Sequence, residues 1–221
     1  EIHRLSKAIE EVLYPAMESG ALDIIIGKGP SARTVQLELP PFTLVAATTR
    51  MSLLSAPLRS RFSGGTFRLE FYSDAEIAEI LERSAALLAV TAPQETLGEI
   101  AKRSRATPRT ANYLLKRCRD LAQLEGGDIL PETVLKTFEL LEIDHLGLHA
   151  PDRAVLKAII EKFKGGPVGL NTIAAATGEE MSTIEDVLEP YLIRQGLLER
   201  TPRGRVATLV AYEHLERASV A

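Results

Sequence analysis

The sequence predicts three structural parts in order: a short α/β part, a helical domain, and a three-helix unit that ends in a β-ribbon. Three observations support this prediction. Alternating and continuous apolar stretches, typical of strands, lie within residues 22–47. Apolar residues recur at helical spacing over residues 74–145. Residues 151–221 carry further helical segments, then two short apolar stretches that flank a Pro-Arg-Gly turn.

The first element is a helix within residues 1–19, with an interruption predicted near Pro15 because proline lacks the N–H that a helix interior needs. The apolar positions at helical spacing are Leu5, Ile9, Val12, Leu13 and Met17. The acidic pair Glu10–Glu11 falls on the opposite face, so the helix is expected to be amphipathic.

A β-hairpin follows, formed by residues 22–26 and 34–39 around a Gly- and Pro-rich turn at 27–31. Side chains alternate along a strand, which places these apolar residues on one face: Ile24 and Ile26 on the first strand, and Val35, Leu37 and Leu39 on the second. Two interpretations stay open. The face packs onto its own domain, or it remains exposed and docks a partner.

The continuous apolar run from Phe42 to Ala47 predicts a strand buried on both faces of a parallel sheet. The run ends in Thr48 and Thr49, at the edge where ligands of open α/β sheets bind. These threonines are therefore candidates for ligand contact, with an ordinary pair of strand-end threonines as the alternative. A second short strand is predicted over residues 67–71.

Four helices are predicted at roughly 74–90, 94–104, 107–125 and 131–142. Ser73 followed by Glu76 marks the first start, and Thr107-Pro108 and Pro131-Glu132 mark two later ones. The helical domain is expected to end between Gly147 and Pro151.

The last part begins with a predicted helix over residues 152–163, which Gly165-Gly166-Pro167 ends. Asn171 and Ser182 are expected to cap two more helices, the first ending at Gly178 and the second at Gly196. Two strands, 197–201 and 206–210, then flank the turn at 202–204. Three helices with an appended β-ribbon are the element order of a winged helix-turn-helix.

Composition limits the function classes. The single cysteine, Cys118, allows no intrachain disulfide, so the cytoplasm is the expected location. No apolar run approaches the roughly 18 residues that can span a bilayer, and no membrane anchor is expected. The four histidines lie too far apart to predict a zinc site, so no metal site is predicted. Because the chain opens on Glu1 without Met, the native polypeptide is expected to extend upstream.

The chain has 26 Lys and Arg against 30 Asp and Glu, a net charge of −4. This overall charge does not favour nucleic-acid binding, so any such binding must come from a local basic patch. The clearest basic patch holds Arg200, Arg203 and Arg205 around the ribbon turn. Residues 151–221 carry nine Lys and Arg and ten Asp and Glu, a net charge of −1. The patch therefore predicts sequence-independent phosphate contact, with a protein-docking wing as the competitor.

Two further arginines stand out. Arg61 lies in the segment Pro57-Leu58-Arg59-Ser60-Arg61-Phe62, and Arg109 lies in the first turn of a predicted helix. The cation of Arg109 gains nothing from the helix dipole in that first turn, which indicates a function. A salt bridge to an acidic helix is the structural alternative.

These segments, taken in order, resemble the RuvB family of AAA+ ATPases along essentially the whole chain. The resemblance rests on residues 1–5, 22–50, 58–62, 107–112 and 165–170, and on 183–196 with 200–206 as the most diagnostic part. It implies the C-terminal part of an AAA+ parallel-sheet ATPase domain over residues 1–72 with its β-hairpin at 22–39. A helical lid over 73–148 and a winged-helix DNA-binding domain over 149–221 would follow.

The resemblance also implies roles for single residues. Glu1 would activate the attacking water, Thr48 or Thr49 would sense the γ-phosphate, and Arg61 would act in trans as an arginine finger. Arg109 would be the sensor of the lid. The remaining implied contacts are to DNA, by Arg200, Arg203 and Arg205, and to RuvA, by Val35 and Leu37.

The function implied by the resemblance is ATP-driven branch migration of Holliday junctions in recombination and repair. A homo-hexameric ring would encircle duplex DNA, with RuvA at the junction and RuvC in the resolving complex. ATP or ADP with Mg²⁺ would be the cofactors of the intact protein.

Some residues depart from the family's pattern. Ala47 and Ala106 stand where the family usually has Gly, and Ser63-Gly64-Gly65 replaces the usual run after Phe62. No G-x-x-x-x-G-K-[ST] pattern occurs, so no phosphate-binding loop is predicted, and these residues alone are expected to hydrolyse ATP negligibly.

Two competing functions remain at this point. A winged-helix DNA-binding regulator without ATPase activity would need base-reading side chains on the helix 182–196, which instead carries Glu185, Asp186 and Glu189. Another AAA+ protein, such as a clamp-loader or initiator subunit, would share the sensor and finger segments but not the hairpin.

Overall fold

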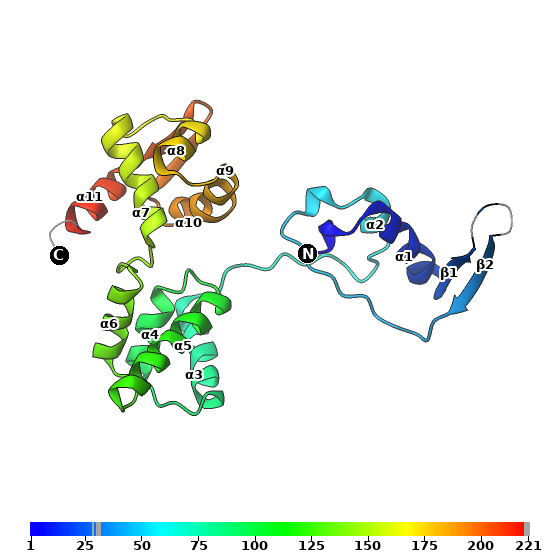
Figure 1. Ribbon diagram of the computed structural model, residues 1–221, viewed down its shortest axis with the longest axis horizontal. Coiled ribbons are helices and arrows are strands. Elements are labelled where there is room, and N and C mark those ends of the chain that lie inside the picture. Colours follow the sequence, from blue (N-terminus) through cyan, green and yellow to red (C-terminus); the bar gives the residue numbers. More distant parts are fainter. Residues whose placement is uncertain (28, 30–31, 219–221) are drawn as a thin grey trace. The chain divides into compact units, whose positions relative to one another are not determined.

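The computed structural model describes residues 1–27, 29 and 32–218. Three residues of the predicted hairpin turn, Lys28, Pro30 and Ser31, lie outside the described residues. The chain divides into two compact units, Glu1–Leu69 and Glu70–Ala221, and Figure 1 shows the elements of each. Within the described residues, no helix is long and apolar enough to cross a membrane.

The first unit opens with a 3₁₀ turn, Ile2–Arg4, and helix α1, Lys7–Ser19. Ser6 caps the helix through its Oγ, and Gly20 ends it at a φ of 69°. The predicted interruption at Pro15 is wrong, because the helix continues through it. Proline removes its own N–H bond and crowds the carbonyl four residues earlier, but Tyr14 and the buried Ala16 hold the helix to the rest of the unit on either side.

The hairpin is confirmed. Strand β1, Ala21–Ile26, pairs antiparallel with β2, Arg33–Glu38, and Ile24 lies opposite Val35. The hairpin stands at the end of the unit away from the N terminus (Figure 1). A 3₁₀ turn, Met51–Leu53, and helix α2, Ala56–Ser60, complete the unit.

The two other strands predicted for this region are wrong in this structure. Residues 42–47 and 67–71 form no strand. Their side chains face solvent instead, with Val45 86% exposed and Phe67 82% exposed. A strand of a parallel sheet needs a neighbouring strand for its backbone groups, and none of the described residues pairs with these segments.

The second unit begins with four helices: α3 Asp74–Leu87, α4 Gln94–Lys102, α5 Pro108–Glu125 and α6 Pro131–Leu140. These match the predicted segments, and Ser73 and Glu76 form the expected capping box. The helices enclose one apolar core that includes the fully buried Ile77, Leu81 and Leu114.

The winged-helix part starts with α7, Ala150–Lys157, which continues as a π-helix, Ala158–Lys162. Then come α8 Leu170–Thr177, α9 Met181–Thr183, a π-helix Ile184–Leu188 and α10 Glu189–Arg194. Strands β3 Leu198–Thr201 and β4 Gly204–Ala207 form the predicted ribbon, and α11 Leu209–Ala218 follows it.

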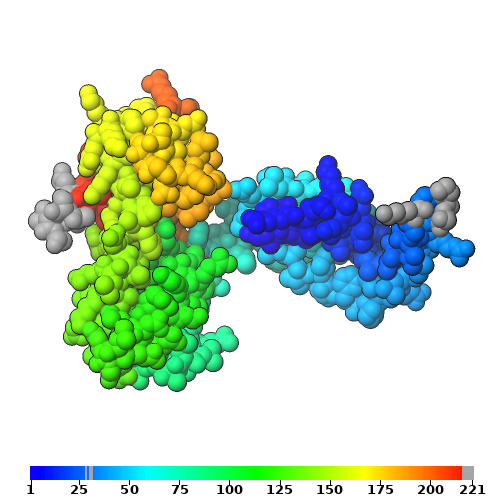
Figure 2. Space-filling model, in the orientation of Figure 1, coloured from blue at the N-terminus to red at the C-terminus, as the bar shows by residue number. Residues whose placement is uncertain are grey.

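Three details of this part differ from the predictions. Gly169 caps α8 in place of Asn171, and α9 starts after Glu180 without a cap from Ser182. The second strand was predicted over residues 206–210, but β4 ends at Ala207, and residues 209–210 begin helix α11, which was not predicted. A second core lies here, with Leu156, Ile173 and Leu192 fully buried. Figure 2 shows both parts of this unit in space-filling form.

Candidate functional site

Glu1 and Thr49 meet although they are 48 positions apart in the sequence. The Thr49 backbone N–H and hydroxyl both point to Glu1 Oε2, each at 3.5 Å. The segments are held together by the Ile2 N–H, which donates to the carbonyl of Ala47 at 3.0 Å. A carboxylate and a pair of threonines from two distant segments thus lie together.

His3 joins this cluster, and the sequence gave it no role. Its Nδ1 lies 3.0 Å from Glu1 Oε2 and 2.7 Å from Thr48 Oγ1. Burial by itself would raise the pKa of Glu1, but the hydrogen bonds from the Thr49 N–H and hydroxyl, with the charge of His3, lower it. The carboxylate is therefore ionised at neutral pH, which is the form that can accept a proton from water.

Arg61 follows helix α2 and lies against α1. Its guanidinium donates to the Pro57 carbonyl at 2.8 Å, pairs with Glu18 at 2.7 Å and stacks 4.2 Å from the Tyr14 ring centroid. The side chain is 22% exposed, so part of it remains accessible. Arg59, by contrast, is exposed, and its side chain makes no hydrogen bond or ion pair with the described residues.

The contacts of α1 correct one expectation. Glu10 is buried, not on a polar outer face, and accepts hydrogen bonds from Ser55 Oγ at 2.6 Å and Tyr14 Oη at 3.2 Å. Glu10, Tyr14 and Glu18 are spaced four residues apart, which puts them on one side of the helix. That spacing shows the shared face in the sequence, but not that Arg61 packs against it.

Arg109 lies in the first turn of α5, as predicted, and is exposed. It makes no hydrogen bond or ion pair within the part of the chain that the structure describes, so the salt bridge considered as the alternative is absent there. Thr107, just before the helix, bonds Thr110 through the two hydroxyls at 2.9 Å. The guanidinium is free to reach a ligand.

The arginines of the ribbon are not equivalent. Arg205 is 8% exposed, and its Nε and Nη2 both donate to Glu189 Oε2, at 3.1 and 2.9 Å. Arg200 pairs with Glu185 at 2.9 Å on the surface. Arg203 is exposed at the turn and its side chain makes no contact of this kind with the described residues. Phosphate contact therefore suits Arg203 best and Arg205 least.

The hairpin presents an exposed apolar face. Val35 is 47% exposed, Leu37 49%, and Ile24, opposite Val35, 44%. In the described structure these residues are thus not covered by packing against their own unit, which was the first of the two interpretations.

The one cysteine is buried. Burial raises the pKa of the Cys118 thiol to about 11, so it stays protonated inside the core of the four helices. Among the described residues no group of three or more His, Cys, Asp or Glu side chains could hold a metal ion.

The unit with the hairpin, the four-helix domain and the winged helix each match a family model. The first is the "Holliday junction DNA helicase RuvB P-loop domain", over residues 1–69. The second is the "RuvB AAA lid domain", over 72–144, and the third the "RuvB C-terminal winged helix domain", over 145–216. The class is therefore that of AAA+ proteins with an appended winged helix.

Known relatives narrow the class. The chain is 59% identical over 216 residues to the Holliday junction branch migration complex subunit RuvB of Dehalococcoides mccartyi. It resembles the structure of the Thermotoga maritima RuvB Holliday junction branch migration motor with a TM-score of 0.79 and 49% identity, covering 98% of this chain and 67% of that one. A mutant of the same protein gives a TM-score of 0.79 at 50% identity, covering 98% and 68%. The chain belongs to the RuvB family.

The alignment with the curated relative covers 97% of this chain and 62% of the relative. The chain thus spans less than two thirds of the length of that protein.

Proposed function

We propose that this chain forms part of an ATP-driven DNA motor that moves the branch point of Holliday junctions in recombination and repair. The observation that carries the proposal is the meeting of Glu1 with Thr49, because it brings the carboxylate proposed to activate water next to the threonines proposed to contact phosphate. Family membership supports the same conclusion. Residues 1–72 would supply ATPase chemistry, 73–148 the lid and 149–221 the DNA contact, in the cytoplasm.

In this proposal each residue of the site has one task. Glu1 accepts a proton from the water that attacks the γ-phosphate, and Thr48 or Thr49 contacts that phosphate through a hydroxyl. Arg109 contacts the nucleotide from the lid. Arg61 acts on the nucleotide of a neighbouring subunit, where a permanently charged guanidinium stabilises the charge that develops on the transferred phosphoryl group. To do so it must exchange Glu18, which is 59% exposed, for the phosphate.

ATP or ADP with Mg²⁺ are the proposed cofactors of the intact protein. Glu1 is the one carboxylate in the cluster with Thr48 and Thr49 among the described residues, so we assign no Mg²⁺ ligand here. The phosphate-binding motif G-x-x-x-x-G-K-[ST] does not occur in the 221 residues. We accordingly propose that these residues alone turn over ATP negligibly.

The winged helix contacts the phosphate backbone of the DNA and not the bases. Arg203 is the main proposed phosphate contact, and Arg200 can add to it by leaving Glu185. The helical segment before the ribbon carries Glu185 and Glu189, whose charges repel phosphate and already bind the ribbon arginines. A sequence-reading regulator, the earlier alternative, is disfavoured for the same reason.

Protein partners complete the proposal. The exposed face with Val35 and Leu37 would dock on RuvA, because a solvent-facing apolar patch of this kind favours a protein partner. Action of Arg61 in trans requires a ring, proposed as a homo-hexamer, with RuvC in the resolving complex.

The test uses the full-length protein with a synthetic four-way junction, ATP and RuvA. Glu1→Gln should keep ATP binding and lose both ATP turnover and branch migration, since the amide accepts no proton. Glu11→Gln, an equal loss of charge on the exposed side of α1, is the matched control and should behave like the parent. Equal loss in both variants, or in neither, would contradict the role of Glu1.

A further inference from the structure

The loop between α4 and α5 has an unusual backbone. Arg105 and Ala106 have φ values of 58° and 55°, in the left-handed region that side chains other than Gly rarely adopt. Two such residues in a row persist only where the surroundings hold them, and such positions cluster at functional sites. Arg109, the proposed nucleotide contact, lies four residues further on.

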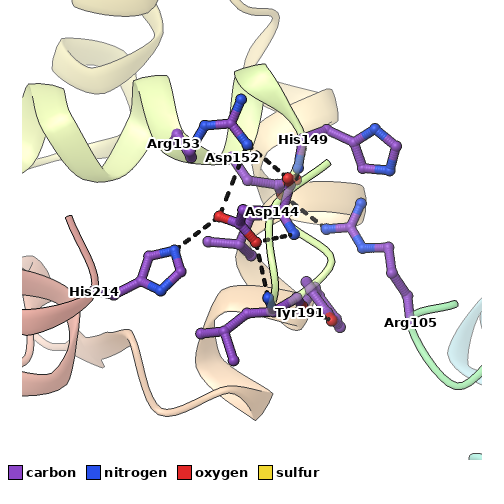
Figure 3. A network of polar contacts seen from close by, with 9 residues as sticks. Arg105, Asp144, His149, Asp152, Arg153, Tyr191 and His214 are labelled. Atoms are coloured by element: carbon purple, nitrogen blue, oxygen red, sulfur yellow. Dashed lines mark hydrogen bonds and ion pairs between the residues drawn. The ribbon is translucent and has the colours of Figure 1, made fainter. Parts of the chain in front are cut away.

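Arg105 reaches from this loop to the winged helix. Its Nη2 donates to Asp152 Oδ1 at 2.8 Å, and the Asp152 side chain is fully buried. The other oxygen, Oδ2, accepts the His149 backbone N–H at 2.8 Å at the start of α7. The Arg105 guanidinium also stacks 4.1 Å from the ring centroid of Tyr191, on α10 (Figure 3).

Residues 141–149 lie between α6 and α7 and join the lid to the winged helix. Tyr191 also contacts this joining segment. The Tyr191 hydroxyl donates to the carbonyl of Leu146 at 2.6 Å. A Cβ on Gly147 would lie 2.8 Å from the Arg103 carbonyl, so the loop and the joining segment are in close backbone contact. Asp144 Oδ1 accepts the N–H groups of Leu146 and Leu148 at 3.0 and 2.9 Å. The joining segment is therefore packed, not a free tether.

Asp144 extends the network to the C-terminal helix. Its Oδ2 lies 2.8 Å from His214 Nε2 on α11, and Arg153 approaches the same oxygen at 3.8 Å. Figure 3 shows Arg105 and His214 approaching the joining segment from opposite sides. The lid loop, the joining segment and three helices of the winged helix are thereby connected through side chains that are mostly buried.

We propose that Arg105 is a positioning residue that couples the nucleotide contact at Arg109 to the DNA contact at Arg203, by fixing the lid and the winged helix as one body. The inference rests on the proposed function. The loop that ends at the first turn of α5 is held by Asp152 and Tyr191, so a shift of that turn on nucleotide binding moves the winged helix with it. Without Arg105 the lid can respond to nucleotide while the winged helix does not follow.

The first test measures rigidity in the 221-residue chain and needs no nucleotide. Spin labels are placed at Lys116→Cys in the lid and Glu199→Cys in the ribbon, both exposed, while Cys118 is buried and remains unlabelled. The variant is Arg105→Met with Asp152→Asn, because Arg105→Ala alone would leave a buried carboxylate without its counter-charge. The label-to-label distance distribution should broaden in this double variant. An unchanged distribution would overturn the proposal.

The second test measures coupling in the full-length protein. Duplex DNA affinity is determined by fluorescence anisotropy with and without a non-hydrolysable ATP analogue. The parent should show a nucleotide-dependent change of about 5- to 150-fold, the usual range of such coupling. In the double variant the change should fall below about two-fold, with nucleotide-free DNA affinity preserved. Arg117→Ala, which removes a surface ion pair with Asp120 on the same lid helix, should keep the parent's coupling.

Broadened label distances with unchanged coupling would overturn the positioning role and leave Arg105 a structural ion pair. A parent whose DNA affinity ignores nucleotide would overturn the proposed motor and the coupling with it. The two failures are distinguishable, because in the second case the label distances still report whether Arg105 fixes the two domains.

Discussion

Residues 1–69 and residues 70–221 bury their apolar side chains to very different degrees. Among the described residues, the buried apolar side chains of the first unit are Ala16, Ala21, Leu54 and Leu58, whereas the second unit has two separate cores. Both units have apolar patterns in their sequences. A helical pattern finds its packing partners among nearby helices, whereas a strand pattern depends on neighbouring strands that sequence periodicity does not identify.

The residues with proposed chemical roles are distributed the other way. The loosely buried unit holds Glu1, Thr48, Thr49 and Arg61, while the well-packed unit holds Arg109 and the ribbon arginines. We expect substitutions in the first unit to affect turnover more than stability, and core substitutions in the second unit to do the opposite.

The largest expected effect is on turnover. Arg61→Ala in the full-length protein should leave ATP binding intact and lower ATP turnover by about three to five orders of magnitude, since a finger acts on the transition state. Steady-state kinetics and equilibrium nucleotide binding measure the two effects. Arg59→Ala, two positions away and exposed, is the control. A larger loss in Arg59→Ala would transfer the role to that residue.

Two alanine substitutions, one in each unit, test the difference in apolar burial between the units. Leu114→Ala, in the fully buried core of the lid, should lower the free energy of unfolding by about 2–5 kcal/mol through lost burial and a cavity. Val45→Ala, at an 86% exposed position, should change it by less than about 0.5 kcal/mol. Urea unfolding of the 221-residue chain, followed by circular dichroism, gives both values. A loss above 1 kcal/mol for Val45→Ala would mean that residues 42–47 are buried after all.

The lid and the winged helix could be predicted closely from the sequence because their signals are local. Ser73 with Glu76, the proline starts and the glycine ends each act within one helical turn. The ribbon followed from the turn at 202–204. Helix α11 was missed, and so was the burial of Glu10, because both depend on packing partners distant in the sequence.

The candidate site was predictable only in part. The segment containing Arg61 could be picked out, but not the Tyr14 and Glu18 platform that holds its side chain. The pairing of Arg205 with Glu189 spans 16 positions and two elements, so charge counting alone placed Arg205 among the phosphate contacts. His3 was considered only as a metal ligand, although it lies between Glu1 and Thr48.

The two titrating residues near the joining segment should act in different pH ranges. Burial lowers the pKa of His149 against the opposing effect of Asp152. As pH falls below about 6.5, the ordinary value for His, the unfolded chain gains a proton that the folded chain resists, so stability declines. His149→Gln should reduce the loss of Tm between pH 7.5 and 5.5. An unchanged loss would contradict this assignment.

Asp144 also destabilises the fold on acidification, but in a lower pH range. Burial raises its pKa, but the hydrogen bonds from His214 and the Leu148 N–H, with the charge of His214, lower it further than burial raises it. A carboxyl with a lowered pKa stabilises the fold above its ordinary value of about 3.9 and loses this effect as pH falls through the folded value. The acid-induced loss of stability below pH 4 should therefore be smaller in Asp144→Asn, as thermal unfolding from pH 5 to 2 would show.

The smallest expected effect concerns the ribbon. Because Arg203 is the exposed arginine of the turn, Arg203→Ala should weaken duplex binding about equally for all sequences and reduce the slope of log affinity against log salt by about 1. Lys157→Ala, on α7, removes the same charge away from the ribbon and should leave the slope unchanged. An effect confined to one DNA sequence would show base reading by the winged helix. That result would favour the DNA-binding regulator without ATPase activity. It would contradict the proposed motor, which must move along DNA of any sequence.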